Sequence, residues 1–181
     1  RRALGWTEAH VVLVHVSTDY ERKGLETIVR ALATLPDDHV LAVAGRGREE
    51  RFRALADKLG VGKRVAFLGY RGDLEAVYPG GDMFVFPPRR DFFGYPGLEA
   101  MACGTPVVAS NAASLPEVIG DAGLICAPQD YNGLAQAMYA VLTKGEIRQS
   151  LIDHGLVRTR QFTWKQAAQQ TLEVYERIVR R

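Results

Sequence analysis

The sequence has few cysteines and histidines, no long apolar run and little excess of either charge. Its two cysteines, Cys103 and Cys126, lie in apolar segments and are too few for a disulfide framework. This favours small buried thiols in a reducing compartment, although a pairing between them stays open. Of the four histidines, His10 and His15 stand five apart on one expected strand and would point to opposite faces, so we expect no metal and no other cofactor. A Gly-x-Ser-x-Gly nucleophile elbow is also absent.

The small charge and the missing apolar runs exclude two further classes of protein. A formal net charge of +2 is too small to indicate nucleic acid as a partner. No apolar run is long enough to cross a bilayer and the N-terminus lacks a signal-peptide pattern, so we expect a cytoplasmic location. What is present, 47% hydrophobic and 24% charged residues over 181 positions, is typical of one globular domain. Because the chain starts at Arg1 and its first methionine is Met83, we expect a piece of a longer protein.

Short apolar segments alternate with helical patterns along the chain. We expect strands at residues 11–16, 39–44, 64–68, 83–86, 106–109 and 123–126. Helices are expected after residue 24, at 49–59, at 74–78 with Asp73 as N-cap, after residue 95, and at 132–143, 147–161 and 164–179. The strands show no alternation of polar residues, so both faces of their sheet must be covered. The sequence therefore predicts an α/β fold, a doubly wound Rossmann-like parallel sheet of about six strands with helices on both faces, over residues 1–181 as one domain.

The stretch from Asp91 to Ser110 combines a polar loop, a short helix and a buried strand. Pro96 suits the first turn of the helix and Gly104 ends it, which places Glu99 on the first turn and Asp91 on the loop before it. In a doubly wound sheet, loops at strand carboxyl ends bind the ligand. A helix start offers N–H groups to a phosphate, and carboxylates accept hydrogen bonds from hydroxyls. This combination predicts a site for a nucleotide-sugar.

The letters of this stretch, DFFGYPGLEAMACGTPVVAS continued by SLPEVIGDAGL, resemble the signature of the retaining glycosyltransferases of family 4 (glycosyl transferases group 1). In that signature two glutamates flank a Phe-Gly-x-Pro core at this spacing. The likeness covers nearly the whole chain as the C-terminal, donor-binding half of the two-domain GT-B fold, and implies that the N-terminal acceptor domain is absent. The competing interpretation is that residues 96–109 are merely a core helix and strand.

The resemblance implies retaining, metal-independent transfer of a hexose from a nucleoside-diphosphate sugar, such as a UDP- or GDP-sugar, in polysaccharide or glycoconjugate synthesis. The partners would be the donor, the N-terminal domain of the same enzyme and, for the full enzyme, a membrane surface. With one wall of the cleft missing, the isolated chain is expected to bind nucleotide and transfer no sugar. The last helix often crosses back to the N-terminal domain in this fold, so part of the apolar stripe on residues 164–179 is expected to be exposed.

Four charged side chains carry the expected chemistry. Lys23 and, second to it, Arg22 open the first helix, and cations there would stabilise the charge that a diphosphate gains as it leaves. Glu99 matches the family's second glutamate, which binds the ribose hydroxyls. Asp91 stands where the first glutamate contacts the donor sugar, but it is shorter by one carbon–carbon bond, about 1.5 Å. The alternatives are a solvated Arg-Lys pair on a surface turn and an aspartate that caps a turn.

Two further groups of residues complete the expected donor site. At the strand ends, the Ser17 hydroxyl would bond a phosphate, and the resemblance implies that the turn at Gly45 lies near the nucleotide. It also implies that the segment with Tyr70 and Arg71 meets the base, the alternative being that these two are ordinary surface residues. In the signature loop we expect the Phe93 ring to anchor the loop against the core. The residues expected to meet the phosphates and sugar through their backbone are Gly94, Tyr95 and Pro96. Many relatives carry Gly-Arg after the first strand. That arginine is absent here, although STDYERKG resembles members that transfer sugars onto lipopolysaccharide cores.

Two other functions stay open from the sequence. A stand-alone nucleotide-binding module without transferase activity would need the same cleft and no second domain. Another GT-B enzyme, such as a sugar-nucleotide epimerase, would need acid–base histidines and carboxylates, which the sequence does not show.

Overall fold

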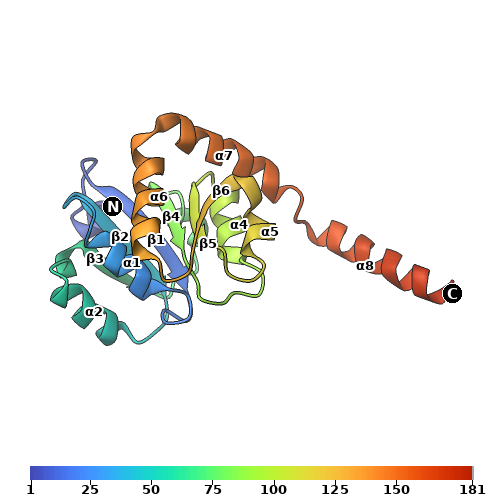
Figure 1. Ribbon diagram of the computed structural model, residues 1–181, viewed down its shortest axis with the longest axis horizontal. Helices are drawn as coiled ribbons and strands as arrows, with labels where there is room; N and C mark the ends of the chain where they lie inside the picture. Colours follow the sequence, from blue (N-terminus) through green and yellow to red (C-terminus); the bar gives the residue numbers. More distant parts are fainter. Residues whose placement is uncertain (181) are drawn as a thin grey trace.

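Six apolar segments form one parallel sheet in the computed structural model, which describes residues 1–180 (Figure 1). The strands are β1 (Val11–Ser17), β2 (His39–Gly45), β3 (Val65–Gly69), β4 (Met83–Phe86), β5 (Val107–Ser110) and β6 (Gly123–Cys126). The helices are α1 (Leu25–Leu32), α2 (Glu49–Lys58), α3 (Leu74–Val77), α4 (Tyr95–Ala102), α5 (Leu115–Ile119), α6 (Tyr131–Thr143), α7 (Gly145–Thr159) and α8 (Trp164–Val179). Short 3-10 turns occupy Arg2–Leu4, Gly62–Arg64 and Gly120–Ala122.

The order of the strands positions the rest of the molecule. It runs β3-β2-β1-β4-β5-β6, with every neighbouring pair parallel. The order reverses between β1 and β4, so the chain leaves these two adjacent strands toward opposite halves of the sheet. A crevice opens at such a reversal, outside the carboxyl ends of the strands. The predicted doubly wound, Rossmann-like fold is confirmed.

Both faces of the sheet are buried, as the unbroken apolar strands predicted. Leu13 of β1 packs in a cluster with α1, α2 and α6, whereas its neighbours Val12 and Val14 pack in a second cluster with α4 and α5. Successive side chains of a strand point to opposite faces, so one apolar run supplies both clusters. Two helical layers therefore sandwich the sheet (Figure 1).

Three local expectations differ from the structure. The signature helix α4 starts at Tyr95, so Glu99 lies on its second turn and not on its first. Asp73 precedes α3, but its carboxylate accepts a hydrogen bond from Arg71 Nε at 2.8 Å and makes no bond to the helix. His10 lies before β1, outside the strand, where its ring contacts the Thr7 backbone and hydroxyl at 3.1 Å. In the last two cases the side chain bonds a nearby residue, Arg71 for Asp73 and Thr7 for His10, and does not have the expected role in a helix cap or a strand. The short helix α5 had no counterpart among the sequence predictions.

The two cysteines are free thiols, as the sequence favoured. Cys126 lies at the end of β6, where its thiol donates to the Ala109 carbonyl at 3.3 Å. Burial raises the pKa of the Cys126 thiol to about 11, and the nearby carboxylate of Asp130 adds to the shift. Because the thiolate is the reactive form, the raised pKa makes this cysteine a weak nucleophile at neutral pH.

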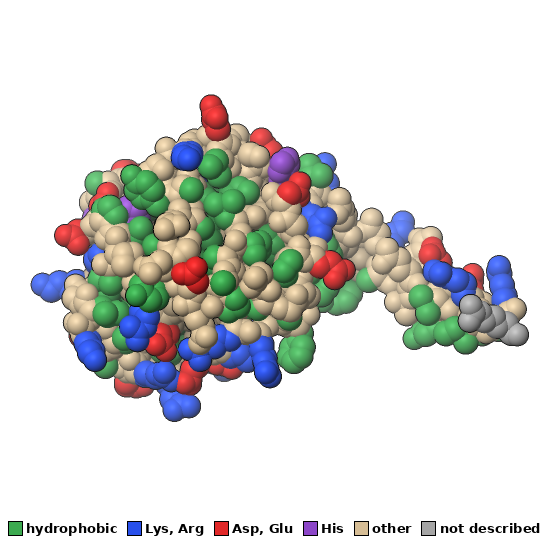
Figure 2. Space-filling view, in the orientation of Figure 1, with side chains coloured by type: hydrophobic (Ala, Val, Ile, Leu, Met, Phe, Trp, Pro, Cys, Tyr) green, Lys and Arg blue, Asp and Glu red, His purple; other side chains and the backbone are tan. Residues whose placement is uncertain are grey.

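The last helix, α8, extends away from the body of the domain (Figure 1) and buries none of its residues. Apolar side chains lie along one side of it (Figure 2), and Leu172, Tyr175 and Ile178 are 56%, 61% and 65% exposed. The expected exposure of this stripe is confirmed, while its contact with an N-terminal domain stays a prediction. None of the helices in residues 1–180 combines the length and the apolar character that crossing a membrane requires.

Candidate functional site

A cavity of about 220 Å³ lies at the carboxyl ends of β1, β2 and β3 and reaches the start of α4. It borders the point where the strand order reverses. Of the residues predicted from the sequence, those that line it are Ser17, Lys23, Gly45, Tyr70, Arg71, Pro96 and Glu99. Those that do not line it are Arg22, Asp91, Phe93, Gly94 and Tyr95. The tertiary structure thus gathers most of the predicted side chains around one hollow.

The loops after β1 and β4 touch because of a glycine at the start of α1. Gly24 has φ +81°, and a Cβ on it would lie 2.0 Å from the Pro87 carbonyl oxygen, which follows β4. The amide of Arg89 in the same segment donates to the Arg22 carbonyl at 2.9 Å. Only a residue without a side chain permits this approach. The approach brings Lys23 to the loop that precedes α4.

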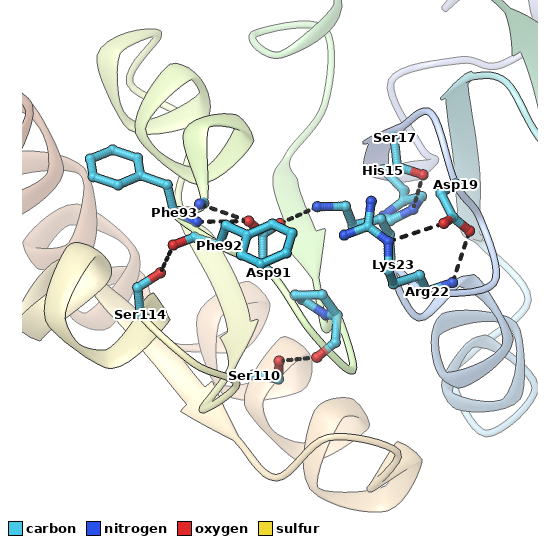
Figure 3. Close-up of polar contacts among 12 residues, drawn as sticks. His15, Ser17, Asp19, Arg22, Lys23, Asp91, Phe92, Phe93, Ser110 and Ser114 are labelled. Atoms are coloured by element: carbon cyan, nitrogen blue, oxygen red, sulfur yellow. Dashed lines mark hydrogen bonds and ion pairs between the residues drawn. The ribbon is translucent and has the colours of Figure 1, made fainter.

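Lys23 and Asp91 form a buried ion pair across the reversal point (Figure 3). Their side chains are 13% and 7% exposed. Asp91 Oδ2 accepts from Lys23 Nζ, and Oδ1 accepts from the backbone N–H groups of Phe93 and Gly94, each at 3.0 Å. Lys23 Nζ also lies 5.3 Å from the centre of the Phe86 ring. The amide of Gly94, expected to face a ligand, is therefore already bonded within the protein.

The charge of Asp91 is stabilised by these three contacts. Burial opposes its ionisation, but the hydrogen bond from Lys23 and those from the Phe93 and Gly94 amides together lower the pKa of the Asp91 carboxyl below its ordinary value. The carboxylate holds the Lys23 ammonium in place and closes the loop before α4. Direct contact of Asp91 with a donor sugar stays a prediction.

Arg22 is engaged on the outer side of the same loop. Its Nε donates to Asp19 Oδ2 at 3.0 Å, its amide donates to Asp19 Oδ1 at 3.1 Å, and its side chain is 40% exposed. The hydrogen bond from the Arg22 backbone N–H is the main cause of the lowered pKa of Asp19. Arg22 therefore shapes the turn that carries Lys23, and its role toward a phosphate stays a prediction.

Glu99 is oriented by a tyrosine that the sequence analysis did not single out. The Tyr78 hydroxyl, at the end of α3, donates to Glu99 Oε2 at 2.7 Å. Tyr78 is 1% exposed, and burial first, then the hydrogen bond to Glu99, raises the pKa of its phenol far above the ordinary value. Oε1 of Glu99 has no hydrogen bond within residues 1–180. Glu99, which lines the cavity, thus has one carboxylate oxygen fixed by Tyr78 and one that is available to a ligand.

His15 is the second functional candidate that the sequence did not reveal. It is fully buried on β1, with Nδ1 3.0 Å from the Val85 carbonyl. Its Nε2 lies 3.2 Å from Ser17 Oγ (Figure 3). Burial, the main cause, and the charge of Lys23 together lower the pKa of His15 to about 4, while the bond to the Val85 carbonyl opposes the change. A histidine within an apolar strand carries no sequence signal for this contact, because Val85 lies on a different strand.

Gly45 at the end of β2 and Tyr70 with Arg71 after β3 also line the cavity. The Tyr70 side chain is 65% exposed, and its ring centre lies 4.6 Å from the Arg46 guanidinium. Arg71 is paired with Asp73. A stacked ring at a cavity mouth suits the flat face of a base.

A larger cavity of about 620 Å³ lies between α4 and the segment that leads into α8. Phe93 and Tyr95 line it with their rings 4.6 Å apart, and Phe93 packs edge-on against Phe162 at 6.0 Å. The packing of Phe93 agrees with the expected anchoring of the loop. We place the site in the smaller cavity because Lys23 and the strand ends converge only there.

No group of three or more metal-ligating side chains is found in the part of the chain that the structure describes.

Comparison with known proteins relates nearly the whole chain to one family. The family model of glycosyl transferases group 1 matches residues 1–157. The O-antigen chain mannosyltransferase B of Escherichia coli is 34% identical over 173 residues, which are 90% of this chain and 45% of that protein. Sucrose-phosphate synthase of Thermosynechococcus elongatus has a similar structure, with 30% identity, a TM-score of 0.86, and coverage of 99% of this chain and 48% of its own. The Anabaena protein HepE, crystallised in complex with UDP-glucose, has 25% identity and a TM-score of 0.87 over 97% of this chain and 51% of its own. The chain thus spans about half the length of these relatives.

Proposed function

The chain belongs to the glycosyl transferases group 1, and we propose that it is the donor-binding domain of a retaining, metal-independent enzyme that transfers a sugar from a nucleoside diphosphate. The observation that carries the proposal is that Lys23, which precedes a helix start and is held by Asp91, lines the same cavity as Glu99. The complex of HepE with UDP-glucose supports a UDP-sugar as the first donor to test. The cytoplasmic location and the association of the full enzyme with a membrane surface belong to the same proposal.

Each side chain has a distinct role in this proposal. Lys23 neutralises the diphosphate as negative charge develops on the leaving group, and Asp91 holds the ammonium in place before the ligand arrives. A cation that is already oriented needs no reorganisation during the reaction, which is the basis of electrostatic catalysis. Glu99 accepts hydrogen bonds from the ribose hydroxyls through its available oxygen. The acceptor and any general base come from the second domain, so the isolated chain binds the donor without transferring the sugar.

We expect Lys23→Ala to weaken binding of a nucleoside diphosphate by about 10- to 150-fold, equivalent to about 1.5 to 3 kcal/mol for a lost charge-assisted contact. Binding of the bare nucleoside should change much less, because the nucleoside has no phosphate. A panel of UDP-, GDP- and ADP-sugars, screened by the rise in melting temperature, selects the base. Titration calorimetry then measures both affinities.

The control for this experiment is Arg30→Ala, which removes a cation of the same helix that pairs with Glu26 and does not line the cavity. It should leave both affinities unchanged. Equal losses for nucleoside and diphosphate in Lys23→Ala would contradict the role given to Lys23. If none of the three classes of nucleotide-sugar raised the melting temperature, the proposed function itself would be contradicted.

Tyr78→Phe is expected to weaken nucleoside diphosphate binding by about two- to tenfold, because Glu99 loses the bond that orients it. The loss should be smaller for the 2′,3′-dideoxy analogue, which cannot use Glu99 in the proposed way. Calorimetry with both ligands provides the comparison. A matched control is Tyr139→Phe, since Tyr139 is 54% exposed on α6, outside the cavity. An identical loss for the ribose and dideoxy compounds would argue against the assignment of Glu99 to the ribose.

A further inference from the structure

The buried contact between His15 and Ser17 determines which way the Ser17 hydroxyl can bond. His15 Nδ1 lies 3.0 Å from the Val85 carbonyl oxygen, and a carbonyl only accepts hydrogen bonds. Nδ1 must therefore carry a proton, because two lone pairs facing each other at this distance would repel. The ring has no exposed surface, and a buried imidazole is neutral unless an anion pairs with it. No carboxylate bonds to the ring within residues 1–180.

A neutral imidazole with its proton on Nδ1 has a bare, accepting Nε2. Ser17 Oγ is 3.2 Å from that atom, so the Ser17 hydroxyl donates its only proton to His15. The lone pairs of Oγ remain, and Ser17 is one of the residues that line the cavity. Toward a ligand, Ser17 is then an acceptor and not a donor.

We propose that His15 fixes Ser17 as a hydrogen-bond acceptor in the cavity, so that Ser17 receives a hydroxyl group of the nucleoside-diphosphate sugar and does not bond its phosphate oxygens. A phosphate oxygen only accepts, and the proton that it would need is already bonded to His15. A sugar or ribose hydroxyl can donate to Oγ. The phosphates are left to Lys23, and Ser17 becomes a residue that selects for hydroxyl groups. This proposal rests on the proposed function.

The position of the proton can be measured without any ligand. In the ¹⁵N-labelled chain, one-bond ¹⁵N–¹H coupling shows which imidazole nitrogen carries a proton, and His15→Gln identifies the His15 signals among those of the four histidines. We expect the proton of His15 on Nδ1. A proton on Nε2 would make Ser17 the acceptor of that bond, free its own proton for a phosphate and overturn the proposal.

The choice of ligand group is tested with Ser17→Ala and three ligands: UDP-glucose, UDP and 2′,3′-dideoxy-UDP, or their guanosine counterparts if these bind better. One lost hydrogen bond weakens binding by about two- to twelvefold. A loss confined to UDP-glucose assigns the Ser17 contact to the transferred sugar, and a loss shared by UDP-glucose and UDP assigns it to the ribose. The dideoxy compound should bind with unchanged affinity in both cases.

Two further results would reject the proposal. Equal losses for all three ligands would show a bond to the phosphates, and no loss for any of them would show no bond at all. Failure of UDP-, GDP- and ADP-sugars to bind the unmodified chain would instead reject the proposed function, and this proposal with it. If Ser17→Ala does not fold, Ser17→Cys replaces the acceptor oxygen by a weakly accepting sulfur in the same place and is held to the same expectations.

Discussion

Replacing Asp91 by alanine is expected to lower the free energy of unfolding by about 3 to 5 kcal/mol, the range for removing one partner of a buried ion pair. The Lys23 ammonium, with only 13% of its side chain exposed, would lose its counter-ion. The amides of Phe93 and Gly94 would lose their acceptor at the same time. Urea unfolding followed by circular dichroism measures the change.

Asp91→Asn separates the two contributions, because its amide oxygen still accepts from the Phe93 and Gly94 amides but carries no charge for Lys23. Its loss of stability should be smaller than that of Asp91→Ala. Arg30→Ala, which breaks a pair on α1 whose side chains are 42% and 26% exposed, should change stability by less than about 1 kcal/mol. If Asp91→Ala were no more damaging than Arg30→Ala, the buried pair would not organise the site as described.

The stability difference between the unmodified chain and Asp91→Asn should also depend on pH. The folded state lowers the pKa of Asp91, so the carboxylate stabilises the fold above the pKa of the unfolded chain, about 3.9. That stabilisation is lost as the pH falls through the lower, folded pKa. The difference should therefore be constant from pH 7 to about pH 5 and shrink below about pH 4.

Gly45→Ala is expected to destabilise the protein by about 2 to 6 kcal/mol, combining backbone strain with overpacking. Gly45 has φ +124°, and a Cβ on it would lie 1.7 Å from the backbone oxygen of Ser17 at the end of β1. Backbone atoms within a paired strand cannot move aside cheaply. Since the ends of β1 and β2 both border the cavity, the substitution should also weaken nucleotide binding.

The matched control is Gly69→Ala at the end of β3. Gly69 also has a positive φ, +66°, but a Cβ on it would have no other atom within 4 Å. Gly69→Ala should therefore lower the free energy of unfolding by only about 1 to 2 kcal/mol, the cost of a left-handed backbone at an alanine. Urea unfolding of both variants measures the two changes in the free energy of unfolding. Similar decreases would show that the close approach of Gly45 to Ser17 does not add to the cost of the substitution.

Much of the molecule could be predicted because its signals are local. The apolar runs and helical stripes depend on neighbouring residues, and they placed the six strands correctly to within about a residue or two, as is usual for element ends. The absence of polar alternation within strands such as β2 indicated that both faces are covered. The likeness of the signature stretch to glycosyl transferases group 1 is confirmed over residues 1–157. The start of α4 differs from the expected one by a single residue, and the loop before it is held by Asp91, whose carboxylate accepts from the Phe93 and Gly94 amides.

By itself, then, the sequence determined the class of fold, the family and the segments that border the cavity, because each of these depends on residues that are close together in the chain. Only the tertiary structure decided which side chains meet. The strand order sets β1 beside β4 and so joins Lys23 to Asp91 across 68 positions, and His15 to Val85 across 70. The physical reason is that a hydrogen bond or an ion pair acts over a few ångströms in space, while the pattern of a single strand is the same whichever strand lies next to it.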